Sequence, residues 1–274
     1  MIEKQIKDSH VLVLASGPNL KKYWGRIEEF IKENDVVTFG CNYITDFIIP
    51  DYHFWGSWKR WIKYSKFIDA EKSVLILSEN SKKNKVHNKL LKQWGGKYTI
   101  FKEVKRRWEF GSEDKKSEQY KKCEVCYRGG TMYGCFFDIS TKAIFYAYIK
   151  GASKITVVGS DGYTFYSKND LKKNKVSQHC YGEGLTDGFT YAYCKRKDWD
   201  KYKTLRLLHK YGKKQYGFGF EIITPTIYEE FYNPDVLNIG SDFSYQKWKE
   251  PKPDEYKKLY FDCLKNRKMT DPKY

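Results

Sequence analysis

The 274-residue sequence has no apolar run long enough to cross a lipid bilayer. Its longest apolar runs, such as residues 11–15 and 155–159, have the length of a β-strand, whereas a membrane helix needs about 20 apolar residues. The first ten residues are polar and contain no apolar stretch before a cleavage site, so we expect no secretion signal. These features exclude an integral membrane protein and favour a cytoplasmic one.

Cysteine is too sparse for a disulfide framework. Seven cysteines, an odd number, are scattered between Cys41 and Cys263, which fits free thiols in a reducing compartment. Cys123 and Cys126 have the opening spacing of a zinc site, but no second cysteine or histidine pair follows them. The sequence therefore predicts neither a metal site nor a resident cofactor.

Positive charge is abundant, but it is confined to two stretches. Residues 81–122 carry 14 basic and 5 acidic side chains and residues 164–216 carry 13 and 5, so these stretches hold the whole net charge of +17. A positive surface attracts phosphates, anionic sugars, nucleic acid or anionic lipid in a salt-dependent way. A solvated lysine-rich surface explains the same count, so charge alone does not identify a partner.

Apolar runs that alternate with helical periodicity predict an α/β fold. The short apolar runs that we expect to be strands are 11–15, 36–40, 51–55, 74–78 and 155–159. Residues spaced as on one helix face predict helices over 20–31, 58–67 and 143–148. Continuous apolar strands are typical of a parallel sheet that helices cover on both faces. We therefore predict a Rossmann-like, mostly parallel sheet with helices on both faces.

Three further segments complete the predicted sheet domain. Residues 221–224 and 236–239 resemble closing strands, and residues 253–264 resemble a terminal helix.

Residues 81–127 are polar and basic, which indicates an irregular excursion with a helix around 85–94.

Residues 164–216 are predicted to form an inserted lid. They contain no strand-like run and end in a helix over 199–211. The nucleotide-binding domain then comprises residues 1–163 and 217–274, and residues 164–216 form a lid or acceptor subdomain.

Small and polar residues follow the predicted strands. In an open α/β sheet the ligand binds beyond the carboxyl ends of the strands. The residues of this kind are Ser16, Gly17, Asn19, Asn42, Ser160, Asp161 and Tyr163. A glycine lets the backbone approach a phosphate, and the start of the next helix offers unpaired N–H donors. Each turn taken singly has a plain structural explanation, and Asp161 alone is more typical of a turn or helix cap than of a metal site.

Four short motifs, in their order along the chain, resemble a known family. They are Ala15-Ser16-Gly17-Pro18-Asn19-Leu20, Gly40-Cys41-Asn42, Gly159-Ser160-Asp161-Gly162-Tyr163 and Gln178-His179-Cys180-Tyr181-Gly182. Over roughly residues 10–225, this order is similar to that in the bacterial sialyltransferases of glycosyltransferase family 42. It is also similar to the wider G-x-G-P-S/N-L group, which includes archaeal pterin pyrophosphokinases and motility-associated transferases.

The resemblance implies a GT-A-like variant of this Rossmann-like sheet and a metal-independent, inverting transfer of a sugar from a cytidine-linked donor. By the matching positions, Ser16, Asn19 and Asn42 contact the donor nucleotide, and Ser140 or Thr141 contacts the donor as well. The pair Gly56-Ser57 stands where the family has a donor-contacting asparagine, so the donor itself stays open.

The resemblance also implies which residues act on the leaving group and the acceptor. Tyr163, and more loosely Tyr166, hold the leaving phosphate in place of a cation. His179 lies where the family keeps a histidine-rich segment and its general base. Glu183 stands where the family has the second histidine of that segment, so either side chain is a candidate for the base.

We therefore expect a glycosyltransferase that moves a sugar from a CMP- or UDP-linked donor to an anionic acceptor. The acceptor is a glycan or a hydroxylated base in DNA, since both basic stretches could follow a phosphate backbone. One alternative is a magnesium-dependent pyrophosphokinase that acts on a small heterocycle. Another is a nucleic-acid-binding module without catalysis. The expected partners are the donor and the acceptor, with no integral membrane contact, and a homo-oligomer stays open.

Overall fold

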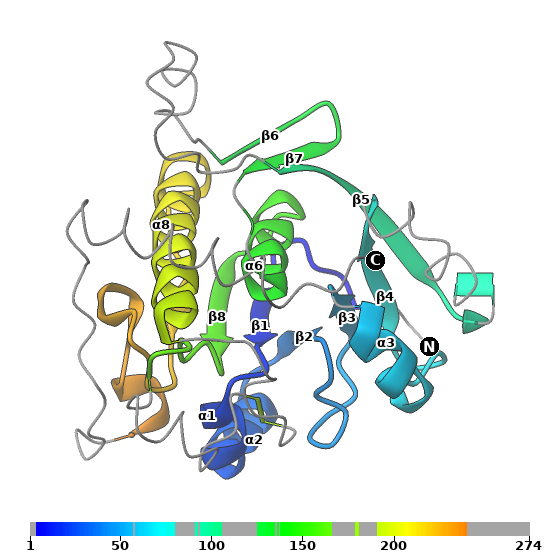
Figure 1. The fold of residues 1–274 in the computed structure, drawn as a ribbon, viewed down its shortest axis with the longest axis horizontal. Helices are drawn as coiled ribbons and strands as arrows, with labels where there is room; N and C mark the ends of the chain where they lie inside the picture. Colours follow the sequence, from blue (N-terminus) through cyan, green and yellow to red (C-terminus); the bar gives the residue numbers. More distant parts are fainter. Residues whose placement is uncertain are drawn as a thin grey trace.

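One mostly parallel sheet organises the chain. The computed structural model describes residues 4–56, 58–79, 91–92, 94–105, 125–134, 136, 138–165, 179–180 and 191–239. Within these residues nine strands form a sheet with the order β6-β7-β5-β4-β3-β2-β1-β8-β9 (Figure 1). All neighbouring strands are parallel except β6 and β7, which are antiparallel.

The strands and helices alternate along the chain. The strands are β1 (His10–Leu14), β2 (Val36–Cys41), β3 (Tyr52–Trp55), β4 (Val74–Ser78), β5 (Tyr98–Lys105), β6 (Cys126–Arg128), β7 (Thr131–Gly134), β8 (Lys154–Val158) and β9 (Glu221–Ile222). The α-helices are α1 (Pro18–Lys22), α2 (Trp24–Glu33), α3 (Trp58–Tyr64), α6 (Ile139–Ile149) and α8 (Tyr191–Tyr216). The short 3₁₀ helices are η1 (Ser65–Phe67), η3 (Glu229–Phe231) and η4 (Asp235–Leu237). The five strands predicted from short apolar runs are confirmed.

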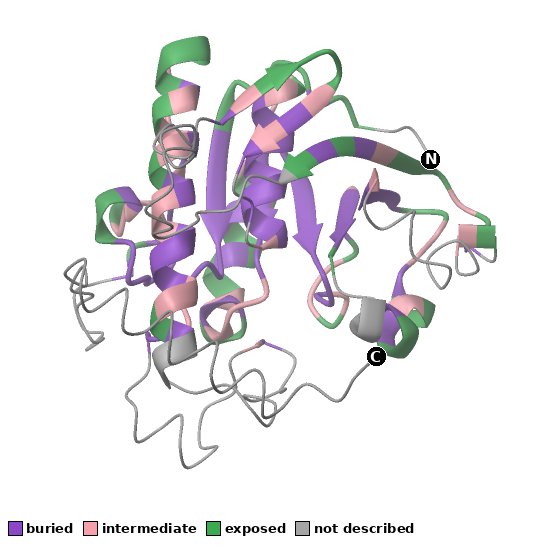
Figure 2. Ribbon diagram, turned by 45° about the horizontal axis from the view of Figure 1, so that its top comes forward, coloured by how far each residue is buried: buried purple, intermediate pink, exposed green. Residues whose placement is uncertain are grey.

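Helices cover both faces of the sheet. Val11 and Val13 of β1 pack into the apolar cluster that contains residues of α6 and α8. Leu12 and Leu14, which point to the opposite face, pack against residues of α1 and α2. Successive side chains of a strand point to opposite faces, so β1 is buried from both sides, as Figure 2 shows for the centre of the sheet. The predicted α/β class is confirmed.

The strand order reverses direction beside β1. Strands β2 to β5 follow one another outward on one side of β1, whereas β8 and β9 lie on the other side. The connections after β1 and β8 therefore diverge at the carboxyl edge of the sheet. Such a reversal leaves a crevice between two neighbouring loops, where ligands bind in open α/β sheets.

Two predictions about the periphery of the sheet are wrong. Residues 81–127 include the long strand β5 and most of β6 rather than only an irregular excursion. In β5 the buried Phe101 and Glu103 alternate with the exposed Lys102 and Val104, so the charged pair Lys102 and Glu103 interrupts the apolar run. Residues 236–239, predicted as a strand, begin with the last two residues of the 3₁₀ helix η4. Asn238 ends it with a positive φ of 48°, which stops an extended run.

Other predictions are shifted or fall beyond the described residues. The helix predicted over 20–31 is divided at Tyr23 into α1 and α2. The helix predicted over 199–211 is longer at both ends, because α8 spans 26 residues. Most of the helix predicted around 85–94 and all of that over 253–264 lie outside the described residues.

The described part of the predicted lid segment includes α8, which packs on the sheet domain. Leu205 and Leu208 are fully buried in the same cluster as Val11 and Val13. None of the described helices is long and apolar enough to cross a membrane.

We expect Gly159→Ala to destabilise the protein far more than Gly130→Ala. Both glycines have a positive φ, 67° and 73°, which costs other residues about 1–2 kcal/mol. A Cβ at position 130 meets nothing within 4 Å, whereas at position 159 it would lie 2.2 Å from the Ala15 carbonyl oxygen. Urea unfolding followed by circular dichroism should show an additional loss of about 2 kcal/mol or more for Gly159→Ala. Equal losses in the two variants would contradict this account of the turn.

Candidate functional site

A pocket of about 270 Å³ opens at the carboxyl ends of β1, β2 and β8. This is the edge where the strand order reverses. Seven of the twelve predicted site residues line it: Ser16, Gly17, Asn42, Ser140, Asp161, Tyr163 and His179. They come from five segments that are far apart in the sequence.

The other five predicted residues do not line the pocket or cannot be placed. Asn19, Thr141 and Ser160 are buried behind its walls. Tyr166 and Glu183 lie outside the described residues.

The loops after β1 and β8 are in direct contact. The Gly17 N–H donates to the Gly159 carbonyl over 2.9 Å. A Cβ at Gly17 would lie 2.3 Å from that same carbonyl oxygen and 2.9 Å from the Asp161 carboxylate. Only glycine fits at position 17, because the loop after β8 occupies the space that a side chain would need. This close contact lets two walls of the pocket meet.

Asp161 caps the helix that follows β1. Its Oδ2 accepts the Asn19 N–H over 2.7 Å, so a carboxylate occupies the start of α1, where the sequence predicts free donors for a phosphate. The Asn19 side chain donates to the Pro225 carbonyl over 2.7 Å and anchors the chain after β9. Asp161 and Asn19 therefore connect the loops that follow β1, β8 and β9. Asn19 itself does not line the pocket.

Burial shifts the protonation of Asp161. Burial raises its pKa to about 7, although the Asn19 N–H and the Lys201 ammonium favour the charged form. The second carboxylate oxygen, Oδ1, is buried and has no hydrogen-bond partner within the described part of the chain. The pocket therefore contains a carboxyl group that gains and loses its proton near neutral pH.

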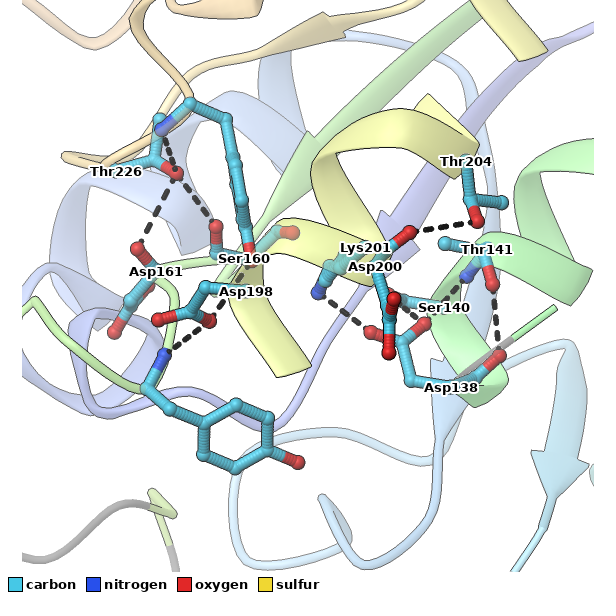
Figure 3. Close-up of polar contacts among 12 residues, drawn as sticks. Asp138, Ser140, Thr141, Ser160, Asp161, Asp198, Asp200, Lys201, Thr204 and Thr226 are labelled. Atoms are coloured by element: carbon cyan, nitrogen blue, oxygen red, sulfur yellow. Dashed lines mark hydrogen bonds and ion pairs between the residues drawn. The ribbon is translucent and has the colours of Figure 1, made fainter. Parts of the chain in front are cut away.

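Asp198 of α8 holds the loop after β8. Its carboxylate accepts the backbone N–H groups of Tyr163 and Thr164 over 2.8 and 2.7 Å, and the Thr164 hydroxyl over 2.7 Å. The Tyr228 hydroxyl also donates to it over 3.1 Å. Burial raises the pKa of Asp198 to about 6, and these donors favour its charged form. The position of Tyr163 in the pocket thus depends on a buried carboxylate of α8, that of Asp198, which is labelled in Figure 3.

A second carboxylate links α8 to the start of α6. Asp138 accepts the Thr141 N–H and the Ser140 hydroxyl over 2.8 and 2.9 Å, which makes it the N-cap of α6. Its other oxygen lies 2.7 Å from Nζ of Lys201, whose side chain is 10% exposed. Burial raises the pKa of Asp138, but Lys201 and the two donors outweigh burial and hold it below its ordinary value. Figure 3 shows this pair bridging the two helices.

A buried ion pair supplies the second lysine of the pocket wall. Lys142 of α6 lies 2.8 Å from the Glu103 carboxylate of β5, which also accepts the Ser78 hydroxyl over 2.6 Å. Because all three residues are buried, the lysine is fixed in place rather than solvated.

Asn42 has a strained backbone that its neighbours stabilise. Its φ is 57°, in the left-handed region, which asparagine tolerates better than most residues. Its carbonyl accepts a hydrogen bond from Nε2 of the fully buried His53, and its side-chain oxygen accepts the Gly56 N–H over 3.2 Å. Burial lowers the pKa of His53 to about 4, so this imidazole stays neutral. The hydrogen bonds to its carbonyl and to its side chain thus fix Asn42 at the carboxyl end of β2.

His179 reaches the pocket through a contact with the first loop. The Cys180 N–H donates to the Ser16 carbonyl over 2.9 Å, which holds residues 179–180 against the loop after β1. His179 is half-buried and lines the pocket with Ser16 and Tyr163. An imidazole is therefore present at the carboxyl edge of the sheet.

Metal chemistry has no evident ligand set in the described segments. They contain no group of three or more histidine, cysteine, aspartate or glutamate side chains that could hold a metal ion. Cys126 is a free thiol, and Cys123 lies outside these segments.

Sequence reasoning missed the ionic groups that α6 and α8 contribute. Asp138 stands just before a helix and three residues ahead of Thr141, which is a recognisable capping signal. Asp198 and Lys201 are three residues apart and share a helix face, but nothing in the sequence distinguishes them from the other charges of α8. Glu103 likewise stands among the lysines of β5, and nothing in the sequence distinguishes it from the other charged residues there.

The sequence matches no family model, and comparison with curated proteins and with solved structures gives no match.

We expect Asp161→Asn to remove a pH dependence of folding. The wild-type carboxyl has a pKa of about 7 when folded and an ordinary value of 3.8, so the folded state binds more protons between these pH values. Its contribution to stability therefore falls as pH rises from about 4 to 7. Asparagine keeps an oxygen for the Asn19 N–H but does not titrate. Urea unfolding at several pH values should show wild type losing stability relative to Asp161→Asn as pH rises, by more than about 1 kcal/mol. Parallel curves would contradict the shift.

Proposed function

We propose that the protein is a glycosyltransferase that resembles the sialyltransferases of family 42. It transfers a sugar from a nucleotide-linked donor to an anionic acceptor by a metal-independent, inverting displacement. The observation that carries this proposal is the single pocket where the loops after β1, β2 and β8 meet His179. We assign the sheet to a Rossmann-like variant of the GT-A architecture, because ligands of such sheets bind at the reversal of strand order.

The walls of the pocket suit a nucleotide. Ser16, Asn42 and Ser140 offer hydroxyl and amide groups at three sides of it, and the backbone at Gly17 has no side chain in the way. Such groups recognise a base and a ribose by hydrogen bonds. In this proposal they hold the donor nucleotide.

The leaving phosphate requires positive or hydrogen-bonding groups. Lys201 and Lys142 line the pocket, and each is fixed by a carboxylate, the half-buried Asp138 and the buried Glu103. Groups held in place before the reaction stabilise developing charge without reorganising. Lys201 and the Tyr163 hydroxyl are the residues that we assign to the departing phosphate.

The displacement needs a proton acceptor. The acceptor hydroxyl attacks the anomeric carbon, the bond from this carbon to the phosphate oxygen breaks, and the nucleotide leaves with the electron pair. The hydroxyl proton passes to a general base. Imidazole accepts protons at neutral pH, so His179 is our first assignment and Glu183 the second.

Nucleotide binding should raise the melting temperature, and CMP should do so more than GDP or ADP. A ligand at a hundredfold excess over its Kd stabilises by about 2.7 kcal/mol, or roughly 3–5 °C for a chain of this size. The shift should disappear in Asn42→Asp, which keeps an oxygen for Gly56 but adds a charge that repels phosphate. Asn238→Asp is the matched control, because Asn238 also has a positive φ but lies outside the pocket. Equal shifts with all nucleotides, or an unchanged Asn42→Asp, would contradict the proposed site.

Replacing His179 by alanine should slow hydrolysis of CMP- and UDP-linked sugars about 100-fold or more, with nucleotide binding retained. His10→Ala is the control, because His10 lies at the opposite end of β1 and bonds Thr156. If His179→Ala stays active, Glu183→Gln should show the loss instead. If both variants release nucleotide from the sugar donor as fast as wild type does, the proposed mechanism is excluded.

The alternative function has its own readout. If the protein transfers pyrophosphate from ATP and a metal chelator abolishes this transfer, the protein is a pyrophosphokinase.

A further inference from the structure

An exposed basic stripe runs along α8. Its members are Lys195, Arg206, Lys210, Lys213 and Lys214, all exposed. At 3.6 residues per turn they fall within a sector of about 100° on one side of the helix, over a length of about 28 Å. Figure 2 shows the outer side of α8 exposed toward its carboxyl end.

The acidic residues of α8 do not neutralise this basic stripe. The helix contains two of them, Asp198 and Asp200, and both are buried. The exposed Glu230 pairs with Arg206 over 2.8 Å. Lys210, Lys213 and Lys214 form no ion pair with a described residue, so the distal part of the stripe keeps its full charge.

The basic stripe lies on the side of α8 that faces away from the pocket, because at 100° per residue its centre is rotated by about 110° from Asp198 and about 170° from Lys201. Asp198 and Lys201, in the amino-terminal half of α8, hold the pocket walls, and α8 extends from there toward the β6–β7 hairpin (Figure 1). About 20 Å of helix separate Lys201 from Lys214. The distal part of the stripe is therefore separated from the pocket both along the helix and around it.

We propose that the basic stripe binds the phosphate backbone of a nucleic acid, chiefly through Lys210, Lys213 and Lys214. Phosphates recur along each strand every 3.4 Å, so these three neighbouring cations can neutralise several of them in any register. A membrane surface fits less well, because the large apolar residues of α8 face the core and Tyr216 alone of those described is substantially exposed. Binding along the stripe stands without the proposed function.

The test compares two triple variants of the full chain. Lys210→Glu/Lys213→Glu/Lys214→Glu reverses the distal stripe. Lys66→Glu/Lys72→Glu/Lys97→Glu makes the same change in net charge at exposed lysines around η1, β4 and β5, on the other side of the sheet. Binding of a fluorescent 30-base single strand and of the same duplex is measured between 50 and 300 mM salt.

The stripe variant should bind DNA at least tenfold more weakly than wild type. The slope of log affinity against log salt should fall by about 2–3, since each lost phosphate contact removes roughly 1. The control variant should lose much less. Similar losses of DNA binding in both variants would show a general effect of net charge and overturn the proposal. Binding of heparin but not of DNA by the wild-type protein would also overturn it.

A separate readout distinguishes this proposal from the proposed function. Hydrolysis of nucleotide-linked sugars by the stripe variant should equal that of wild type, because the three lysines lie far from the pocket. If no nucleotide-linked sugar is hydrolysed but DNA binding is lost only in the stripe variant, the surface assignment stands and the glycosyltransferase fails.

Discussion

The close approach of two backbones beside β1 is the constraint on which the site depends. Gly17 and Gly159 let the loops after β1 and β8 bond directly, and no side chain would fit at either position. Asp161 then ties the second loop to the first helix. Since these loops leave adjacent parallel strands in opposite directions, their contact sets the floor of the crevice on which the other walls are built.

Helix α8 is both a structural layer and a source of site residues. Its apolar side, with Leu205 and Leu208, completes the core over the sheet. Its buried polar side contributes Asp198 and Lys201, which fix the loop after β8 and the start of α6. A change in the packing of this helix would therefore move the pocket walls, and the charge of its outer side can vary without disturbing them.

The sequence predicted the centre of the fold better than its edges. Strands buried on both faces have continuous apolar runs, as in β1 and β8, and these are recognisable without any knowledge of neighbours. β5 is exposed on one face, and Lys102 and Glu103 interrupt its apolar run, so its place in the sheet was missed. Within the site, the loops that line the pocket were predicted because they directly follow predicted strands along the chain. The ion pairs of Asp138 and Glu103 were not, because they join residues 63 and 39 positions apart and depend on tertiary packing.

The two outermost strands restrict how copies of this chain can associate. β6 has three residues and ends in a Gly-Gly turn, and β9 has two, with Ile222 already bridged to Tyr232 on its outer side. Short or covered edges offer few unpaired backbone groups to a neighbouring sheet, which protects against edge-to-edge aggregation. Self-association through a continuous intermolecular sheet is thereby disfavoured, and a dimer of this protein would have to use helical or loop surfaces.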